Sequence, residues 1–269
     1  MAELAGVSAT ALRTPGFFRV SQLVPVDQDV LTISVGTKAG QALDLMRQHN
    51  FDQLPVTTAD QRVIGAFTYR SLAYGLHHLR SQGNSLATPV DELVEELRFV
   101  RASQDVSEIV DFLYADHAVL VGDEDRLLAV VTIADVSRFL WERTRPFVLL
   151  QDIELAIRGL MRSTCTPNEL ADCVAAGLPS DAPAMGGRLE DLSLGELFSV
   201  LLHGPNFGRC FRLAFGTNRD LVRTTLMPVR EIRNKVFHFR DEISSEELRQ
   251  LRDVARWLRR KIMIRGGSQ

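Results

Sequence analysis

Short apolar stretches of strand length alternate with longer amphipathic stretches over the first half of the chain. The helical spacing of apolar residues predicts one helix from Thr37 through Met46 and another over Tyr69–Leu79. Three stretches have the length and β-branched content of strands: Leu31–Val35, Gln53–Val56 and Val63–Thr68. The expected order is therefore strand, helix, strand, strand, helix.

The same order recurs further along the chain. The second copy comprises, in order, Leu97–Arg101, Asp105–Leu113, Ala118–Val121, Leu127–Thr132 and Ile133–Trp141. Thr68 and Thr132 close the last strand of each copy and stand 64 positions apart. An internal repeat of this kind predicts two homologous modules, at 20–80 and 81–145, after a leader at 1–19 to which we assign no function.

Beyond Arg145-Pro146 the strand-like alternation ends and the apolar spacing is helical. Ser193 and Glu196 form a capping box ahead of one of these helices. The expected helices are Phe147–Met161, Asn168–Ala176, Leu194–Leu202, Phe207–Phe215, one from Thr217 or Asn218 through Leu226, and Glu246–Ile264 capped by Ser244 or Ser245. The predicted fold class is an α+β N-terminal half of two βαββα modules, followed by an all-α helical bundle over residues 146–269.

The distribution of charge along the chain adds more to this prediction than the overall composition does. The chain has 269 residues, 45% hydrophobic and 24% charged, which is typical of globular proteins and long enough for two domains. From Pro228 to Gln269, eleven Lys and Arg outnumber six Asp and Glu, whereas the remaining residues carry a net charge of −8. A basic end on an acidic body is typical of an anion-binding module, although helices with solvated arginines have the same composition.

Other sequence features exclude several classes of protein. No run of eighteen apolar residues and no signal-peptide pattern is present, so we expect a soluble, cytoplasmic protein without a membrane partner. The three cysteines, Cys165, Cys173 and Cys210, include no Cys-x-x-Cys pair. Their spacing predicts neither a disulfide framework nor a metal site.

Each module of the repeat places a Thr at a junction between strand and helix. A Thr hydroxyl beside the free N–H groups of a helix start suits a phosphate, although the same Thr is also an ordinary N-cap. Asp135, three residues after Thr132, can accept hydrogen bonds from ribose hydroxyls. Ser71 stands at the equivalent place after Thr68, so we expect at most one complete nucleotide site.

The segments Gly65-Ala66-Phe67-Thr68-Tyr69-Arg70-Ser71 and Ala129-Val130-Val131-Thr132-Ile133-Ala134-Asp135 resemble the ending of CBS domains. The resemblance extends over about residues 20–145. It implies two modules packed with pseudo-twofold symmetry and an adenine nucleotide (AMP, ADP or ATP) as regulatory ligand in a cleft between them. The contacts that it implies are Thr132, Asp135, Thr68, Leu54 and Val56, the last two through the backbone of a strand that faces the adenine ring.

Arg233-Asn234 and His238 bring a permanent cation, an amide and an imidazole together on an expected helix. An imidazole can transfer protons near pH 7, and a guanidinium can hold a phosphate by two contacts. Asn234 and His238 share one helix face, whereas Arg233 lies about 140° from His238. Either the arginine side chain wraps around the helix or a second subunit completes the site. The alternative is that these are solvated helix charges.

The stretch Val229–Phe239, preceded by Leu192–Leu197 and followed by a capped arginine-rich helix, resembles the motif region of HEPN domains. Such domains typically dimerise with the motif helices facing each other, and many cleave RNA without a metal, leaving a 2′,3′-cyclic phosphate. The resemblance implies that His238 transfers protons, that Arg233 stabilises the pentacoordinate phosphate and that Asn234 orients it.

The leading hypothesis from the sequence is a nucleotide-regulated, metal-independent endoribonuclease. The CBS pair would sense an adenine nucleotide, and a HEPN homodimer would cut RNA without a catalytic cofactor. A toxin or antiviral defence role follows from the resemblance alone. The main alternative is a non-catalytic nucleotide sensor whose helical domain only dimerises and binds a partner or RNA.

Overall fold

The structure is a computed structural model that describes residues 18–24, 30–78, 85–179, 188–239 and 241–266. The chain divides into two compact units, residues 1–140 and 141–269. Most of the expected leader therefore lies outside the described residues. No described helix has the length and apolar character that crossing a membrane requires.

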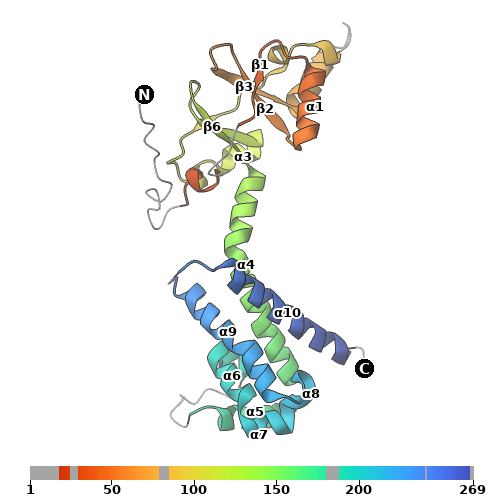
Figure 1. Cartoon of the computed structure of the whole chain (residues 1–269), viewed down its shortest axis with the longest axis vertical. Coiled ribbons are helices and arrows are strands. Elements are labelled where there is room, and N and C mark those ends of the chain that lie inside the picture. Colours follow the sequence, from red (N-terminus) through yellow and green to blue (C-terminus); the bar gives the residue numbers. More distant parts are fainter. Residues whose placement is uncertain (1–17, 25–29, 79–84, 180–187, 240, 267–269) are drawn as a thin grey trace. The chain divides into compact units, whose positions relative to one another are not determined.

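The first unit contains two three-stranded sheets of the same topology (Figure 1). In each sheet the first strand runs parallel to the second, and the second runs antiparallel to the third. The strands are β1 (Ile33–Ser34), β2 (Gln53–Thr57), β3 (Val63–Thr68), β4 (Phe99–Val100), β5 (Ala118–Gly122) and β6 (Leu127–Thr132). Their helices are α1 (Ala39–His49), α2 (Tyr69–His78), α3 (Val110–Asp116) and the start of α4 (Ile133–Arg162).

The repeated order of elements that the sequence predicts is confirmed. The bounds of β3 and β6 match the expected strands residue for residue. The first strand of each module is shorter than expected, because only two residues of β1 and of β4 pair with the neighbouring strand. The described part of this unit also contains short 3-10 turns at Val20–Gln22, Ser85–Ala87, Val90–Leu93 and Val106–Glu108.

One apolar cluster joins the two modules. It contains Val63 and Ala66 from β3, Ala118 and Leu120 from β5, and Leu97 ahead of β4. The backbones of Ala66 and Glu95 also exchange hydrogen bonds of 2.9 and 3.0 Å. This approach requires Gly65, whose φ is +144° and where a Cβ atom would lie 2.6 Å from the carbonyl oxygen of Glu95. The cluster fixes the strand ends on which the cavity described below is built.

The second unit is a helical bundle. It contains the rest of α4, α5 (Pro167–Gly177), α6 (Leu194–Leu202), α7 (Gly204–Asn206), a π-helical turn (Phe207–Phe211), α8 (Arg212–Phe215), α9 (Arg219–Phe237) and α10 (Ser245–Gly266), with a 3-10 turn at Leu189–Asp191. One buried cluster draws on all of these helices except the short α7, from Leu150 in α4 to Leu258 in α10. The expected mostly helical C-terminal half is confirmed, and residues 180–187, between α5 and α6, lie outside the described residues.

Capping boxes begin several of these helices. The Ser193 hydroxyl accepts from the N–H of Glu196, and the Glu196 carboxylate accepts from the N–H of Ser193, as the sequence predicts. The same reciprocal pair joins Ser244 and Glu247 at the start of α10. Each box satisfies two N–H groups that have no partner within the helix.

Two prolines do not end helices where the sequence predicts a break. α4 continues through Pro146, and α9 continues through Pro228. A proline inside a helix removes one backbone hydrogen bond and its ring crowds the preceding turn, which costs about 3 kcal/mol. In α9 the side chains of Leu226 and Val229, on either side of the proline, are buried in the core, so packing holds the helix together there.

Candidate functional site

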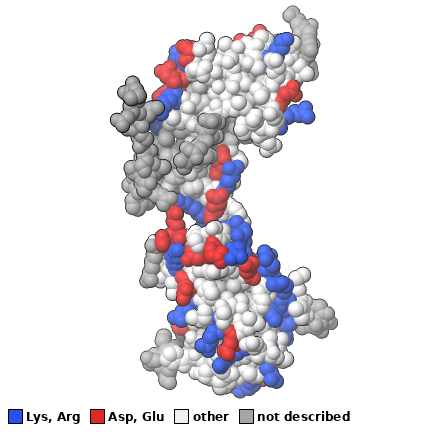
Figure 2. Space-filling model, in the orientation of Figure 1, with Lys and Arg blue, Asp and Glu red and all other residues white. Residues whose placement is uncertain are grey.

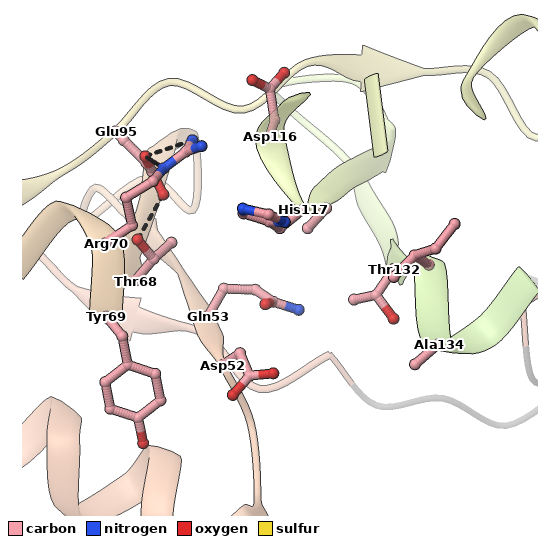
Figure 3. Close-up of a pocket in the computed structure, with 12 residues that line it drawn as sticks. Asp52, Gln53, Thr68, Tyr69, Arg70, Glu95, Asp116, His117, Thr132 and Ala134 are labelled. Carbon is pink, nitrogen blue, oxygen red and sulfur yellow. Dashed lines mark hydrogen bonds and ion pairs between the residues drawn. The ribbon is translucent and has the colours of Figure 1, made fainter. Parts of the chain in front are cut away.

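A cavity of about 360 Å³ lies between the two modules of the first unit (Figure 3). Its walls come from the start of β2 and of β5 and from the ends of β3 and of β6. The lining residues are Asp52, Gln53, Thr68, Tyr69, Arg70, Glu95, Asp116, His117, Ala118, Thr132, Ile133 and Ala134. Five of the first-module residues are matched by second-module residues 64 positions later. The cavity therefore lies on the axis of the internal repeat.

Thr68 and Arg70 of the first module form a hydrogen-bonded group with Glu95, which lies just ahead of β4. The Thr68 hydroxyl donates to one carboxylate oxygen of Glu95 at 2.5 Å, and Nε of Arg70 donates to the other at 2.8 Å. Arg70 also donates through Nη1 to the carbonyl of Ala115, at the end of α3, at 2.8 Å. Figure 3 shows this group along one side of the cavity. The Glu95 carboxylate therefore already accepts hydrogen bonds from the Arg70 guanidinium and the Thr68 hydroxyl, the two donors that would otherwise bind an anion.

The second module contributes Thr132, whose hydroxyl and N–H both donate to Oδ2 of Asp135, at 2.7 and 2.9 Å. Asp135 therefore caps the first turn of α4. In the first module Ser71 has this capping role. Its hydroxyl donates to the Thr68 carbonyl and accepts from the Thr68 N–H. The replacement of Asp by Ser keeps the local cap and removes one negative charge.

The structure brings together some of the residues that the sequence singled out. Thr68 and Thr132 both line the cavity, whereas Asp135 is not among the lining residues. The side chains of Leu54 and Val56 have no exposed surface and belong to the core of the first module. Only their backbone is available for the adenine contact that the resemblance implies.

Sequence reasoning missed several lining residues. Asp52 and Asp116 are equivalent in the repeat, as are Gln53 and His117, and all four lie at or within two residues of the start of β2 or β5. Figure 3 shows Gln53 and His117 pointing into the space between the modules. The repeat offset, applied to polar residues as well as to Thr68 and Thr132, would have identified the Asp pair. Glu95 has no such signal, because its place depends on the packing between modules.

The charged residues of this cavity determine which chemical groups of a ligand each wall can bind. Among the lining residues, the carboxylates of Asp52, Glu95 and Asp116 stand against one guanidinium, that of Arg70. Asp116 is paired with Arg98 at 3.4 Å. An acidic wall suits hydroxyl and amino groups that donate hydrogen bonds, and Arg70 is the group placed to receive an anion.

In the second unit, Arg233 and Asn234 lie near the end of α9. Nη1 of Arg233 donates to the amide oxygen of Asn234 at 3.3 Å, and the guanidinium carbon lies 4.9 Å above the ring of Phe237. No salt bridge joins Arg233 to a carboxylate within the described part of the chain. A guanidinium in this state keeps its charge available to a phosphate.

His238 follows the last residue of α9 and is exposed. Its backbone N–H donates to the carbonyl of Asn234 at 3.2 Å, which continues the helical path by one residue. The neighbouring Lys235 is held by Glu247 of α10 at 3.0 Å. The structure thus joins Arg233 to Asn234 directly and leaves the imidazole of His238 open to solvent.

Residues 20–78 match the CBS domain family. An inosine-5′-monophosphate dehydrogenase from Methanocaldococcus jannaschii is 22% identical over 116 residues, 42% of this chain and 22% of that protein. A cystathionine beta-synthase from Dictyostelium discoideum is 28% identical over 119 residues, 41% of this chain and 23% of that protein. The chain therefore spans less than a quarter of the length of these curated relatives.

Among solved structures, that of CBSX2 in complex with AMP is 20% identical, with a TM-score of 0.39, and covers 46% of this chain and 97% of that one. The family match places a CBS-type α+β fold in the N-terminal half. It does not extend to the helical C-terminal region.

Proposed function

We propose that the cavity between the modules binds an adenine nucleotide and that the helical unit is a metal-independent endoribonuclease under its control. The observation that carries the first part is the cavity itself, in which two equivalent Thr residues at strand–helix junctions face one space. Its volume of about 360 Å³ lies within the range of small-molecule sites, roughly 300–1,000 Å³.

In this proposal each wall of the cavity holds a different part of the nucleotide. Arg70 and the N-terminal end of α2 receive the phosphate once Glu95 releases the guanidinium. Asp52 and Asp116 accept hydrogen bonds from ribose hydroxyls or from the adenine amino group. A nucleotide with one phosphate fits these charges better than ATP, because three carboxylates oppose further negative charge. AMP is therefore the first ligand to test.

The ribonuclease proposal rests on the end of α9. Arg233 is half-buried and makes no ion pair among the described residues, and His238, five residues further along the chain, is exposed. In the proposed reaction His238 removes the proton of the RNA 2′-hydroxyl, and the 2′-oxygen attacks the adjacent phosphorus. The bond to the 5′-oxygen breaks, and this oxygen takes up a proton from the solvent. Arg233 stabilises the charge that develops on the phosphoryl oxygens, and Asn234 orients it. The 2′-oxygen is the nucleophile, so this step requires no metal.

A homodimer would complete the site. Phe237 is 48% exposed and Phe239 is 84% exposed, although both are large apolar side chains next to the motif. Their burial between two copies of α9 would bring Arg233 of one copy towards His238 of the other. Figure 2 shows Lys and Arg side chains along α10, interspersed with Asp and Glu, which offers the RNA backbone contacts beside this surface.

The regulatory part of the proposal rests on α4. This helix begins at Ile133, which lines the cavity, and ends at Arg162, after Leu160 and Met161 of the bundle core. If the ligand binds more tightly when the start of α4 is in one of two positions, binding shifts the helical bundle towards the conformation that accompanies that position. Comparison of RNA cleavage with and without AMP shows whether the nucleotide activates or inhibits the enzyme.

The test is incubation of the purified chain with total RNA in EDTA, with and without AMP. We expect cleavage by the wild type that leaves 2′,3′-cyclic phosphate ends. His238→Ala should lower the rate at least about a hundredfold, because general acid–base catalysis contributes ~10²–10⁴-fold. His49→Ala, which removes an exposed histidine of the first unit, is the matched control and should cleave like the wild type.

The second candidate function is a non-catalytic nucleotide sensor. It is favoured by the contacts that Arg233 already makes within its own chain, to Asn234 and to the ring of Phe237. Intact RNA in every lane, together with AMP binding to the wild type, would establish this alternative. Absence of AMP binding with RNA cleavage retained would instead remove the nucleotide part of the proposal alone.

A further inference from the structure

The helical unit brings all three cysteines of the chain to one place. Cys165 lies in the turn between α4 and α5, Cys173 in α5, and Cys210 in the π-helical turn Phe207–Phe211. Their sulfur atoms lie within 4.8 Å of one another, and those of Cys173 and Cys210 are 3.6 Å apart. We propose that Cys165, Cys173 and Cys210 bind a soft divalent metal ion of the zinc class.

The distances fit such an ion. Zinc–sulfur bonds of about 2.3 Å in tetrahedral geometry place the thiolates roughly 3.8 Å apart. The separation of Cys173 and Cys210 is already close to that value, and side-chain rotation of Cys165, which is half-buried, can bring the third sulfur to it. Soft thiolate ligands select zinc and related ions over magnesium or calcium. Three protein ligands leave a fourth position for a small molecule such as water.

A neighbouring cation balances the charge of the proposed complex. Three thiolates and one divalent ion carry a net charge of −1. Nη2 of Arg209 lies 3.8 Å from the sulfur of Cys173, and its side chain reaches this sulfur from an exposed position. The guanidinium therefore neutralises the complex without being buried itself.

The local backbone offers an independent reason to assign function here. Cys210 lies in a π-helical turn, a conformation that is rare and frequently occurs at functional sites. The Asn206 side chain, which is buried, donates to the carbonyl of Cys173 at 2.7 Å and so ties α5 to the start of this turn. The turn and this hydrogen bond set Cys210 opposite Cys173.

Metal binding replaces protons on the thiols. A cysteine binds a metal ion as the thiolate, so each of the three thiols gives up its proton. On binding, three S–H bonds break, three sulfur–metal bonds form, and three protons pass to the solvent. No oxidant or reductant takes part.

The test is titration of the full chain, freed of metal and kept reduced by a phosphine, with Cd²⁺ as a spectroscopic probe. We expect one equivalent to produce the ultraviolet charge-transfer absorption of cadmium thiolates and to raise the midpoint of thermal unfolding. Zn²⁺ should compete with Cd²⁺ for the site and remove this absorption. Cys165→Ser should weaken Cd²⁺ binding at least about tenfold and lower the absorption by about a third, since one of three thiolates is lost.

Two further variants separate the metal site from simple core packing. Arg209→Gln should weaken Cd²⁺ binding several-fold, whereas Arg212→Gln, the same change at an exposed arginine of α8, should not. Circular dichroism is the check that each variant is folded. A folded wild type without charge-transfer absorption, or one whose absorption equals that of Cys165→Ser, would overturn the proposal.

Discussion

Glu95 controls what the cavity presents to a ligand. Its carboxylate holds both the Thr68 hydroxyl and the Arg70 guanidinium, and its side chain is 18% exposed while that of Arg70 is 32% exposed. An ion pair at this depth competes directly with any phosphate for the same donors. The Glu95 carboxylate therefore competes with the phosphate of a nucleotide for Arg70 and Thr68.

Neutralising Glu95 should strengthen nucleotide binding. In Glu95→Gln the guanidinium of Arg70 is free to pair with the AMP phosphate, and one charge-assisted hydrogen bond contributes ~1.5–3 kcal/mol. We expect the Kd for AMP, measured by isothermal titration calorimetry, to fall about tenfold, or ~1.4 kcal/mol. Glu96→Gln, which removes the same charge from an exposed neighbouring position, should leave the Kd unchanged. Weaker binding by Glu95→Gln would show that the carboxylate itself contacts the ligand.

Among the elements, α10 positions the end of α9. Its capping residue Glu247 accepts from the N–H of Ser244 at 2.7 Å and from the ammonium of Lys235 in α9 at 3.0 Å. One carboxylate thus closes the start of α10 and links it to the turn that carries Arg233 and Asn234. The stability of the candidate catalytic stretch therefore depends on the charge of Glu247.

Acid should weaken this link. The Ser244 N–H, and then Lys235, hold the pKa of Glu247 below its ordinary value of 4.5. The unfolded chain binds this proton more readily than the folded chain does, so the contribution to stability is present above about pH 4.5 and is lost as the pH falls through the lower folded pKa. Urea unfolding of wild type and Glu247→Gln should differ at pH 7 and converge in acid. Glu231→Gln, a change at an exposed position of α9, should keep the wild-type pH dependence.

For the whole molecule, assembly is the main question, because the proposed ribonuclease site draws on two copies of the chain. Phe239, in the left-handed region with φ of +50°, presents almost its entire ring to solvent. A large exposed aromatic residue next to a candidate catalytic histidine is typical of an interface anchor.

Removing this anchor should separate the two copies. Phe239→Asp should weaken self-association at least about tenfold in sedimentation equilibrium, since aromatic anchors contribute ~2 kcal/mol or more. RNA cleavage should fall with the dimer fraction. Leu213→Asp, a change at a similarly exposed apolar residue of α8, is the control and should remain associated. Monomers that cleave RNA at the wild-type rate would contradict a site shared between copies.

The sequence alone determined the local features of this protein. The repeat that relates Thr68 to Thr132, the bounds of β3 and β6, and the Ser193 capping box follow from periodicity and short-range hydrogen bonding, which act within a few residues. The assignments of Arg233, Asn234 and His238 stay predictions, because their chemistry depends on a second copy or on RNA.

Only the tertiary structure decided which distant residues meet. Glu95 reaches Thr68 and Arg70 through packing between modules, and no sequence spacing indicates that contact. The continuation of α9 through Pro228 likewise depends on core contacts that outweigh one lost hydrogen bond. The three cysteines, whose spacing predicts no metal site, converge because α5, the π-helical turn and the end of α4 contribute to one buried core. Such contacts arise from burial between elements far apart in the chain, which local patterns do not encode.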